Sequence, residues 1–142
     1  MDNELAARLL DQAPDAAIFA GTDGMITYWN AAAERIFGHT PEAALGQSLD
    51  LIIPEQYRDA HWTGFDRALS EGDTKYRGQA LATKSARADG ETIYVELSFA
   101  IIKGADGAVS GAMAMARDIT ERFTADRDMR RRLRELEKAA AS

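Results

Sequence analysis

The chain has 142 residues, a formal net charge of −6 and 46% hydrophobic residues, which suits one domain with a well-filled core and short extensions. The acidic balance argues against binding along a nucleic-acid backbone, and the one basic run, at 130–134, is balanced by acidic neighbours on a solvated helix face. The absence of cysteine excludes disulfides, thiolate metal sites and covalent cysteinyl chemistry.

The sequence carries no recognisable targeting signal or membrane span. The first 14 residues, MDNELAARLLDQAP, are acidic and lack both the basic flank and the apolar run of a signal peptide. No stretch reaches the roughly 18 consecutive apolar residues that a spanning helix needs. We therefore expect a soluble, cytoplasmic protein that binds neither membrane nor nucleic acid.

The first part of the chain predicts a short helix followed by a β-hairpin. Leucines recur on one face of residues 3–12, and Pro14 ends that helical pattern. The segments 16–20 and 25–29 have the composition of strands, and the Asp23-Gly24 pair between them is typical of a tight hairpin turn. We expect these two strands to pair.

Helices follow the hairpin. Asn30 is a favourable N-cap residue, and Gly38 ends the alanine-rich helix that it begins. Short helical turns are expected over 40–54, and then a longer helix over 55–70 that Gly72 terminates. Four residues of the longer helix recur at helical spacing and share one face: Tyr57, His61, Phe65 and Ala68.

The second half of the chain predicts three strands, over 74–86, 92–99 and 109–116, with Asp-Gly turns between them. Along the middle strand polar and apolar residues alternate, which indicates one buried and one exposed face. The apolar set is Ile93, Val95, Leu97 and Phe99. In the last strand methionines alternate with alanines, so either set can face the core. That strand continues without a break into a charged helix that begins near Asp118.

This order of elements predicts an α+β domain in which helices cover one face of a sheet. We divide the chain into an N-terminal flanking helix (1–14), the domain (15–120) and a C-terminal signalling or coiled-coil helix (121–142). Because the last strand and the last helix are continuous, a change in the sheet has a short covalent route to that helix. No nucleophile-and-base pair or phosphate-binding glycine loop is recognisable, so we expect a transmitting protein and not an enzyme.

Three segments, taken in order, resemble a PAS domain: PDAAIFAGTDGMITYWNAAAERIFG, LGQSLDLIIPEQYRDAH and GAMAMARDITER. The resemblance covers roughly residues 9–122. It implies a five-stranded antiparallel sheet with helices on one face, a small ligand or cofactor beneath them, and a role in sensing and signal transduction. It also implies homodimerisation through the flanking helices. Asp118, Ile119 and Thr120 resemble the junction that relays the signal to the following helix.

Two cofactors are candidates within this family. Light-oxygen-voltage members hold flavin and form an adduct through a cysteine, so the absence of cysteine excludes that photochemistry and makes flavin the less favoured candidate. Oxygen-sensing members hold haem, and the run IPEQYRDAH is similar to the one that ends in their proximal histidine. The resemblance therefore implies His61 as the ligand of a haem iron and Arg67 as the partner of a haem propionate.

The remaining residues expected to contact the cofactor are Phe65, Leu81, Leu97, Phe99 and Met113. Leu81 marks a departure from the haem pattern, because oxygen-sensing members commonly carry an arginine at that point of the strand. Without such a donor, bound oxygen is poorly stabilised and uncharged gases fit better. Tyr76 and Gln79 are the alternative donors that the sequence offers. Three alternatives stay open: a sensor of some other small molecule, a haem gas sensor, and a ligand-free dimerisation module whose interior is filled by its own side chains.

Partner contacts are expected at the surface. Trp62 points away from His61 on the helix, which makes it a candidate for an exposed contact at a dimer interface, with packing inside the domain as the alternative. His39 and His61 lie on separate elements, so a two-histidine metal site is not expected. The C-terminal helix approximates a heptad seam that Arg122 and Asp126 interrupt, and the residues of the seam are Ile119, Met129, Leu133, Leu136 and Ala140. The partner or effector domain that receives the signal is not identified by the sequence.

Overall fold

A computed structural model describes residues 1–74 and 79–141. Its core is a five-stranded antiparallel sheet with the strand order β2-β1-β5-β4-β3. The strands are β1 (Ala16–Gly21), β2 (Ile26–Trp29), β3 (Leu81–Ala86), β4 (Thr92–Lys103) and β5 (Val109–Asp118). The helices are α1 (Asn3–Asp11), α2 (Ala31–Phe37), α3 (Pro41–Ala44), α4 (Arg58–Glu71) and α5 (Thr120–Ala141), with 3-10 turns η1 (Leu49–Ile52) and η2 (Glu55–Tyr57). The expected α+β architecture is confirmed.

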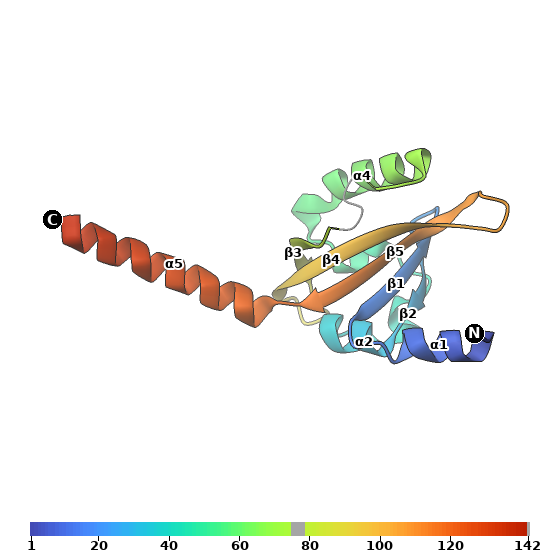
Figure 1. Cartoon of the computed structure of the whole chain (residues 1–142), viewed down its shortest axis with the longest axis horizontal. Coiled ribbons are helices and arrows are strands. Elements are labelled where there is room, and N and C mark those ends of the chain that lie inside the picture. The colour runs from blue at the N-terminus through green and yellow to red at the C-terminus, as the bar shows by residue number, and fades with distance from the viewer. Residues whose placement is uncertain (75–78, 142) are drawn as a thin grey trace.

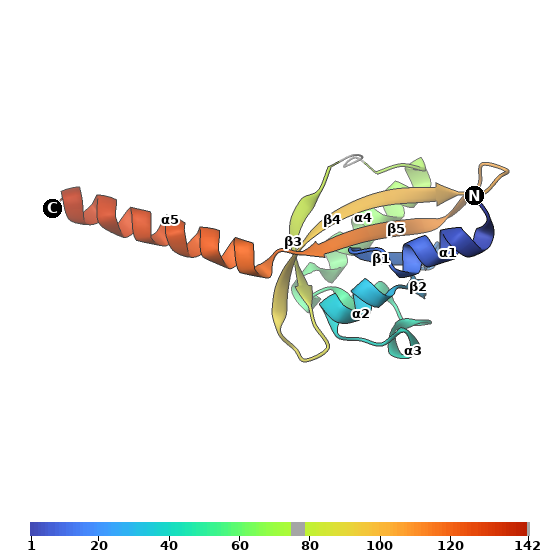
Figure 2. The ribbon, with the colours of Figure 1, turned by 60° about the horizontal axis from the view of Figure 1, so that its bottom comes forward.

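The helices divide into a covering layer and two flanking arms. Figures 1 and 2 show α2, α3 and α4 gathered over the sheet, whereas α5 projects away from it as a long isolated arm. The two termini lie at opposite ends of the molecule (Figure 1). Within the described part of the chain, no helix combines the length and hydrophobicity that crossing a membrane requires.

The alternation expected in β4 defines the two faces of the sheet. Ile93, Val95 and Leu97 are buried and face the helical layer. In β5 the alanines share this core face, because Leu97 pairs with Ala116 across the ladder. Met113 and Met115 therefore lie on the opposite, outer face of the sheet, and the small alanines leave room for helices to approach the core side.

Asn30 joins three elements through its fully buried side chain. Its Oδ1 accepts hydrogen bonds from the N–H groups of Ala17 (2.9 Å) and Ala33 (3.0 Å), and the second of these caps α2. Its Nδ2 donates to the carbonyl oxygens of Leu10 (2.8 Å) and Asp15 (3.1 Å). The end of α1, the entry to β1 and the start of α2 are thus fixed by one amide.

Two expected boundaries differ from the structure. The helix expected over 55–70 is divided into η2 and α4, because the Arg58 guanidinium donates to the carbonyl oxygens of Ile53 (3.0 Å) and Asp50 (3.3 Å) and pins the chain at the junction. The strand expected over 74–86 is shorter, since β3 begins at Leu81, and residues 75–78 lie outside the described part. Both β4 and β5 extend beyond the expected strands.

Candidate functional site

The inner face of α4 is the first candidate surface. Its half-buried residues follow the helical repeat and turn toward the sheet: Arg58, His61, Trp62, Phe65, Ala68 and Leu69. None of the 14 residues of α4 is fully buried, and the buried core cluster is built from the sheet, α2, α3 and η1 without them. The helix therefore covers the sheet without completing its core.

His61 occupies the middle of this face. Its ring lies edge-on to Trp62, with centroids 4.7 Å apart, and its centroid is 5.9 Å from that of Phe65. The Nδ1 atom is buried, and none of the residues that the structure describes offers it a hydrogen-bond partner. Burial lowers the pKa of His61 below its ordinary value, and the negative charge of Asp50 opposes that effect. The imidazole is therefore neutral at physiological pH, with one buried nitrogen available to a ligand.

Trp62 packs inside the domain, which is the second of the two alternatives that the sequence left open for it. Its indole Nε1 donates a 2.8 Å hydrogen bond to Oδ1 of Asp50 in η1. The ring lies directly over Gly24 in the turn between β1 and β2, where an added Cβ would overlap it. The sequence did not identify these two partners, because Gly24 and Asp50 are remote from Trp62 along the chain.

The sheet side of this region is apolar. Leu97 is buried and Phe99 packs against the buried core from the same face of β4. Leu81 pairs with Leu97 across the ladder and so shares that face, where its side chain offers no hydrogen-bond donor. The expected position of Met113 needs correction: it pairs with Phe19 and Ala100 on the outer face, so the sheet separates it from the other expected contacts.

Arg67 lies on the exposed side of α4, away from the half-buried face that carries His61. The side chain expected to pair with a haem propionate is therefore not beside the histidine in this structure. The arginine that does share the inner face is Arg58, and it is already bonded to two carbonyl oxygens. Arg58 precedes His61 by three residues, and this spacing in the sequence could have indicated that the two share a face of the helix.

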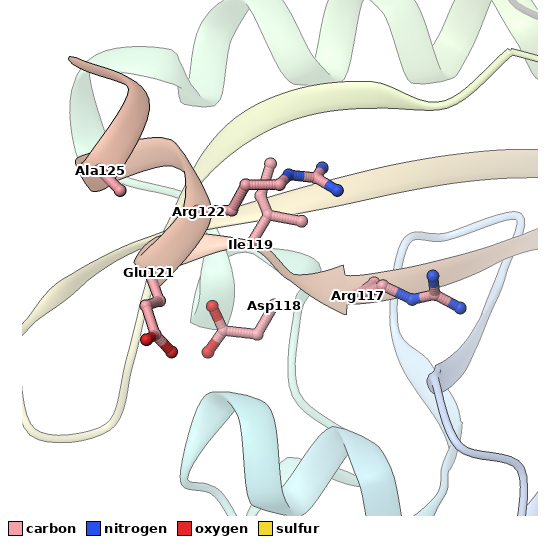
Figure 3. Close-up of a pocket in the computed structure, with 6 residues that line it drawn as sticks. All are labelled: Arg117, Asp118, Ile119, Glu121, Arg122 and Ala125. Atoms are coloured by element: carbon pink, nitrogen blue, oxygen red, sulfur yellow. The ribbon is translucent and has the colours of Figure 1, made fainter. Parts of the chain in front are cut away.

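The second candidate surface is the junction between β5 and α5 (Figure 3). Oδ1 of Asp118 accepts hydrogen bonds from the backbone N–H (2.9 Å) and the hydroxyl (2.6 Å) of Thr120. The N–H of Ile119 donates to the carbonyl oxygen of Tyr94 (2.8 Å), and the Tyr94 N–H donates to the Thr120 hydroxyl (3.0 Å). The three residues expected to relay the signal therefore bind α5 to the neighbouring strand.

Side chains on the outer face of β4 hold the first turns of α5. The Tyr94 and Phe123 rings are stacked, with centroids 4.1 Å apart and an angle of 16° between planes. Arg127 donates to the Tyr94 hydroxyl at 3.4 Å. From Met129 onward every described residue of α5 is exposed, including Leu133 and Leu136.

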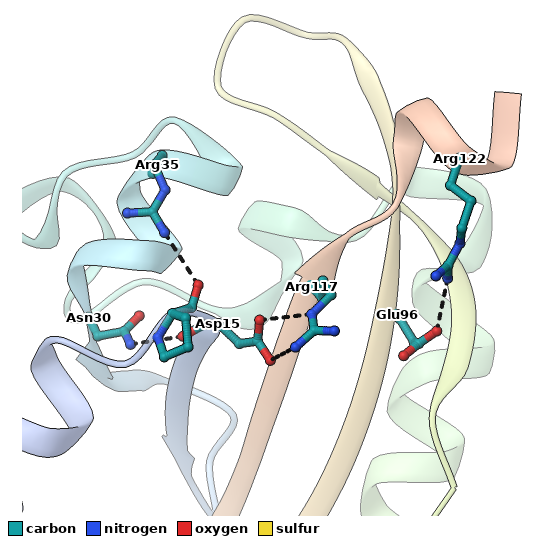
Figure 4. A network of polar contacts seen from close by, with 7 residues as sticks. Asp15, Asn30, Arg35, Glu96, Arg117 and Arg122 are labelled. Atoms are coloured by element: carbon teal, nitrogen blue, oxygen red, sulfur yellow. Dashed lines mark hydrogen bonds and ion pairs between the residues drawn. The ribbon is translucent and has the colours of Figure 1, made fainter. Parts of the chain in front are cut away.

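Charged side chains extend the junction toward the N-terminal segment (Figure 4). Arg117 of β5 donates two hydrogen bonds to Asp15, at 3.1 and 3.2 Å, and this bonding raises the pKa of Arg117. Glu96 faces Arg117 across the ladder and accepts a 3.2 Å hydrogen bond from Arg122. Exposed ion pairs contribute little to stability. These charged side chains therefore orient α5 and the N-terminal segment relative to the sheet more than they stabilise the fold.

Two shallow hollows lie along the arm. The first, of about 450 Å³, is at the junction and is lined by Arg117, Asp118, Ile119, Glu121, Arg122 and Ala125 (Figure 3). The second, of about 360 Å³, follows the apolar stripe of α5 through Met129, Leu133 and Leu136. In residues 1–74 and 79–141 no three His, Asp or Glu side chains lie together in a way that could hold a metal ion.

Comparison with known proteins agrees with this geometry. An uncharacterized protein of Azorhizobium caulinodans is 37% identical over 91% of this chain, and the sensor protein FixL of Bradyrhizobium diazoefficiens is 30% identical over 80% of it. The matches span only 18% and 22% of those relatives' own lengths. The crystal structure of a PAS domain from Colwellia psychrerythraea superposes with a TM-score of 0.72 at 23% identity, covering 83% of this chain and 97% of that one.

The family described as the PAS fold matches residues 10–123, which include the whole sheet and its helical layer. The five-stranded antiparallel sheet is the one that the resemblance of the sequence implied, and β5 leads into α5 as expected. This chain belongs to the PAS-fold family and is a PAS sensory domain.

Proposed function

We propose that this domain senses a small molecule held between the inner face of α4 and the core face of the sheet, with His61 as its polar contact. The observation that carries the proposal is the His61 Nδ1 atom on the inner face of α4, which is buried and has no partner among residues 1–74 and 79–141. The helix itself contributes no residue to the buried core. Buried polar groups in native proteins almost always have a partner, so a group left without one indicates a missing ligand or water.

Haem is the first ligand to test. A neutral, half-buried imidazole suits an axial ligand of iron, and His61 has both properties. The group, when bound, would supply an iron centre that binds gases. The rest of the expected haem set fits less well, because Arg67 faces solvent and Met113 is on the far side of the sheet. The wider class of candidate ligands comprises small, largely apolar molecules that carry one group able to bond to imidazole.

The output of the domain is a change in how α5 pairs with α5 of a second copy. The exposed seam of Met129, Leu133 and Leu136 lacks a partner in the described chain. In a parallel pair these residues occupy the contact positions, and Arg132 then lies at the position that faces Glu137 of the other helix. A shift of the sheet reaches this seam through Asp118–Thr120. The effector domain of a longer protein would receive it, since the chain spans about a fifth of the relatives named above.

The proposal is tested by absorbance spectroscopy of the purified chain after addition of haem, with His61→Ala as the variant and His39→Ala as its matched control. We expect a Soret band in the wild type that His39→Ala keeps and His61→Ala loses. An equal band in His61→Ala rules out the histidine as the iron ligand. If the wild type shows no band, native mass spectrometry of the unreconstituted protein must reveal another retained molecule. If none is found, the sensing proposal is wrong.

A ligand-free dimerisation module is the second candidate. It is favoured by apolar side chains exposed on both flanking helices, namely Leu5, Leu9 and Leu10 on α1 and Met129, Leu133 and Leu136 on α5. This alternative predicts a stable dimer in sedimentation experiments whose affinity is unchanged by any ligand. Substitution of Leu133 by Glu tests it directly, since a charge at the seam must dissociate the dimer, whereas Glu at the exposed Arg130 must not.

A further inference from the structure

Trp62 is held in place from three sides. Its indole N–H is bonded to Asp50 at 2.8 Å, and the six-membered ring rests on Gly24, which has no side chain to exclude it. The third contact is Phe65, whose ring is edge-on to the indole with centroids 5.2 Å apart. Because its one polar atom is hydrogen-bonded and its rings contact Gly24 and Phe65, the Trp62 side chain has a single preferred position.

The supports of Trp62 belong to one rigid unit. The N–H of Asp50 donates to the hydroxyl of Ser48 (3.1 Å), and the N–H of Leu49 donates to the carbonyl oxygen of Gly24 (3.1 Å). The turn under the ring and the acceptor of the indole proton are therefore joined to each other by backbone hydrogen bonds. Arg58 adds a further link, because it donates to the Asp50 carbonyl oxygen at 3.3 Å from the start of α4.

His61 depends on this unit for its orientation. Its ring is bounded by Trp62 on one side, edge-on at 75°, and by Phe65 on another. No described residue forms a hydrogen bond with Nδ1, so the contacts with the two neighbouring rings hold that buried atom in its present direction. If the indole moves, the imidazole loses the ring contact that determines the orientation of its Nδ1 atom.

We propose that Trp62, anchored by Asp50 and seated on Gly24, is the positioning residue of the His61 site and links α4 to the turn between β1 and β2. This inference rests on the proposed ligand site and assigns its orienting residues. A ligand that displaces the imidazole also displaces the indole, and the displacement then reaches Asp50 and the β1–β2 turn. The site thereby has a mechanical connection to the edge of the sheet opposite β3, in addition to the one through β5.

The test uses nuclear magnetic resonance of the ligand-free chain labelled with ¹⁵N and ¹³C. Trp62→Phe keeps an aromatic ring and removes the N–H, Asp50→Ala removes the acceptor, and Asp50→Asn retains an oxygen acceptor without the charge. Trp29→Phe is the matched control, because the other indole of the chain donates to a carbonyl oxygen of His39 at 2.9 Å, away from α4. The readouts are exchange of the Trp62 indole proton with solvent and the chemical shifts of the His61 ring signals.

We expect indole exchange to rise roughly tenfold in Asp50→Ala and to remain slow in Asp50→Asn, as loss and retention of one hydrogen bond imply. The His61 ring signals must shift in Trp62→Phe and Asp50→Ala and stay unchanged in Trp29→Phe. Unchanged His61 signals in Trp62→Phe and Asp50→Ala overturn the inference. Since no ligand is added, this result is independent of whether haem or another molecule binds.

Discussion

The helices α2 and α4 cover the same sheet in different ways. Of the seven residues of α2, four are buried in the core: Ala32, Ala33, Ile36 and Phe37. None of the 14 residues of α4 is buried to that extent, although the helix is twice as long and carries two aromatic rings and a histidine on its inner face. The short helix is part of the buried core, whereas the long helix covers the sheet without contributing a buried residue.

The N-terminal ends of the two helices also indicate that α2 is the more firmly held. The side chain of Asn30 caps α2 with a hydrogen bond to Ala33, whereas no side chain caps the start of α4 at Tyr57. A side-chain N-cap typically stabilises a helix by about 1 kcal/mol. Of these two helices only α2 has this contribution. We therefore expect that displacing α4 lowers the free energy of unfolding less than displacing α2 does.

Two phenylalanine truncations give the largest effect and test the comparison most directly. Phe37→Ala removes a ring with no exposed area from α2, and we expect it to lower the free energy of unfolding by about 3–5 kcal/mol. Phe65→Ala removes a half-buried ring from α4, and we expect a loss of about 1–2 kcal/mol. Urea unfolding of both variants measures the difference. Equal losses would show that α4 is as firmly packed as α2.

A smaller effect is expected at α5, which extends the comparison to a third helix. Its first residue, Thr120, bonds to Asp118 and Tyr94 through its hydroxyl, so α5 is anchored at its start as α2 is. Thr120→Val keeps the shape and removes these bonds, which we expect to cost about 1 kcal/mol. Hydrogen exchange in the first turn of α5 measures the loosening. Thr124→Val, one turn later, is the control and leaves exchange there unchanged.

The smallest effect is a pH dependence of stability that arises from the two histidines. Burial lowers the pKa of His61 in α4 and of His39 after α2 below the ordinary value of 6.5. The unfolded chain therefore binds protons more tightly than the folded chain, so stability falls as the pH drops below 6.5. We expect His61→Gln and His39→Gln each to flatten this decline in urea unfolding measured at several pH values. A decline as steep in both variants as in the wild type contradicts the prediction.

The sequence alone determined the elements and their faces wherever a local pattern carries the information. The Asp-Gly turn and the capping Asn30 predicted the first hairpin and α2, because turn and cap geometry depend on a few adjacent residues. The alternation along β4 predicted its buried face, since a period of two with polar residues on one side has only one stable orientation. The continuity of β5 with α5 was equally local, and the structure confirms it.

Only the tertiary structure decided which residues meet at the site. Both faces of β5 are apolar, so the pairing with β1 and β4, and not the pattern, placed Met113 on the outer face. Helical spacing predicted that His61 and Phe65 share a face, yet it carried no information on what lies opposite that face. The seat of Trp62 on Gly24 and its bond to Asp50 join segments far apart in the chain. Such contacts depend on how the elements are stacked, which no local pattern of residues encodes.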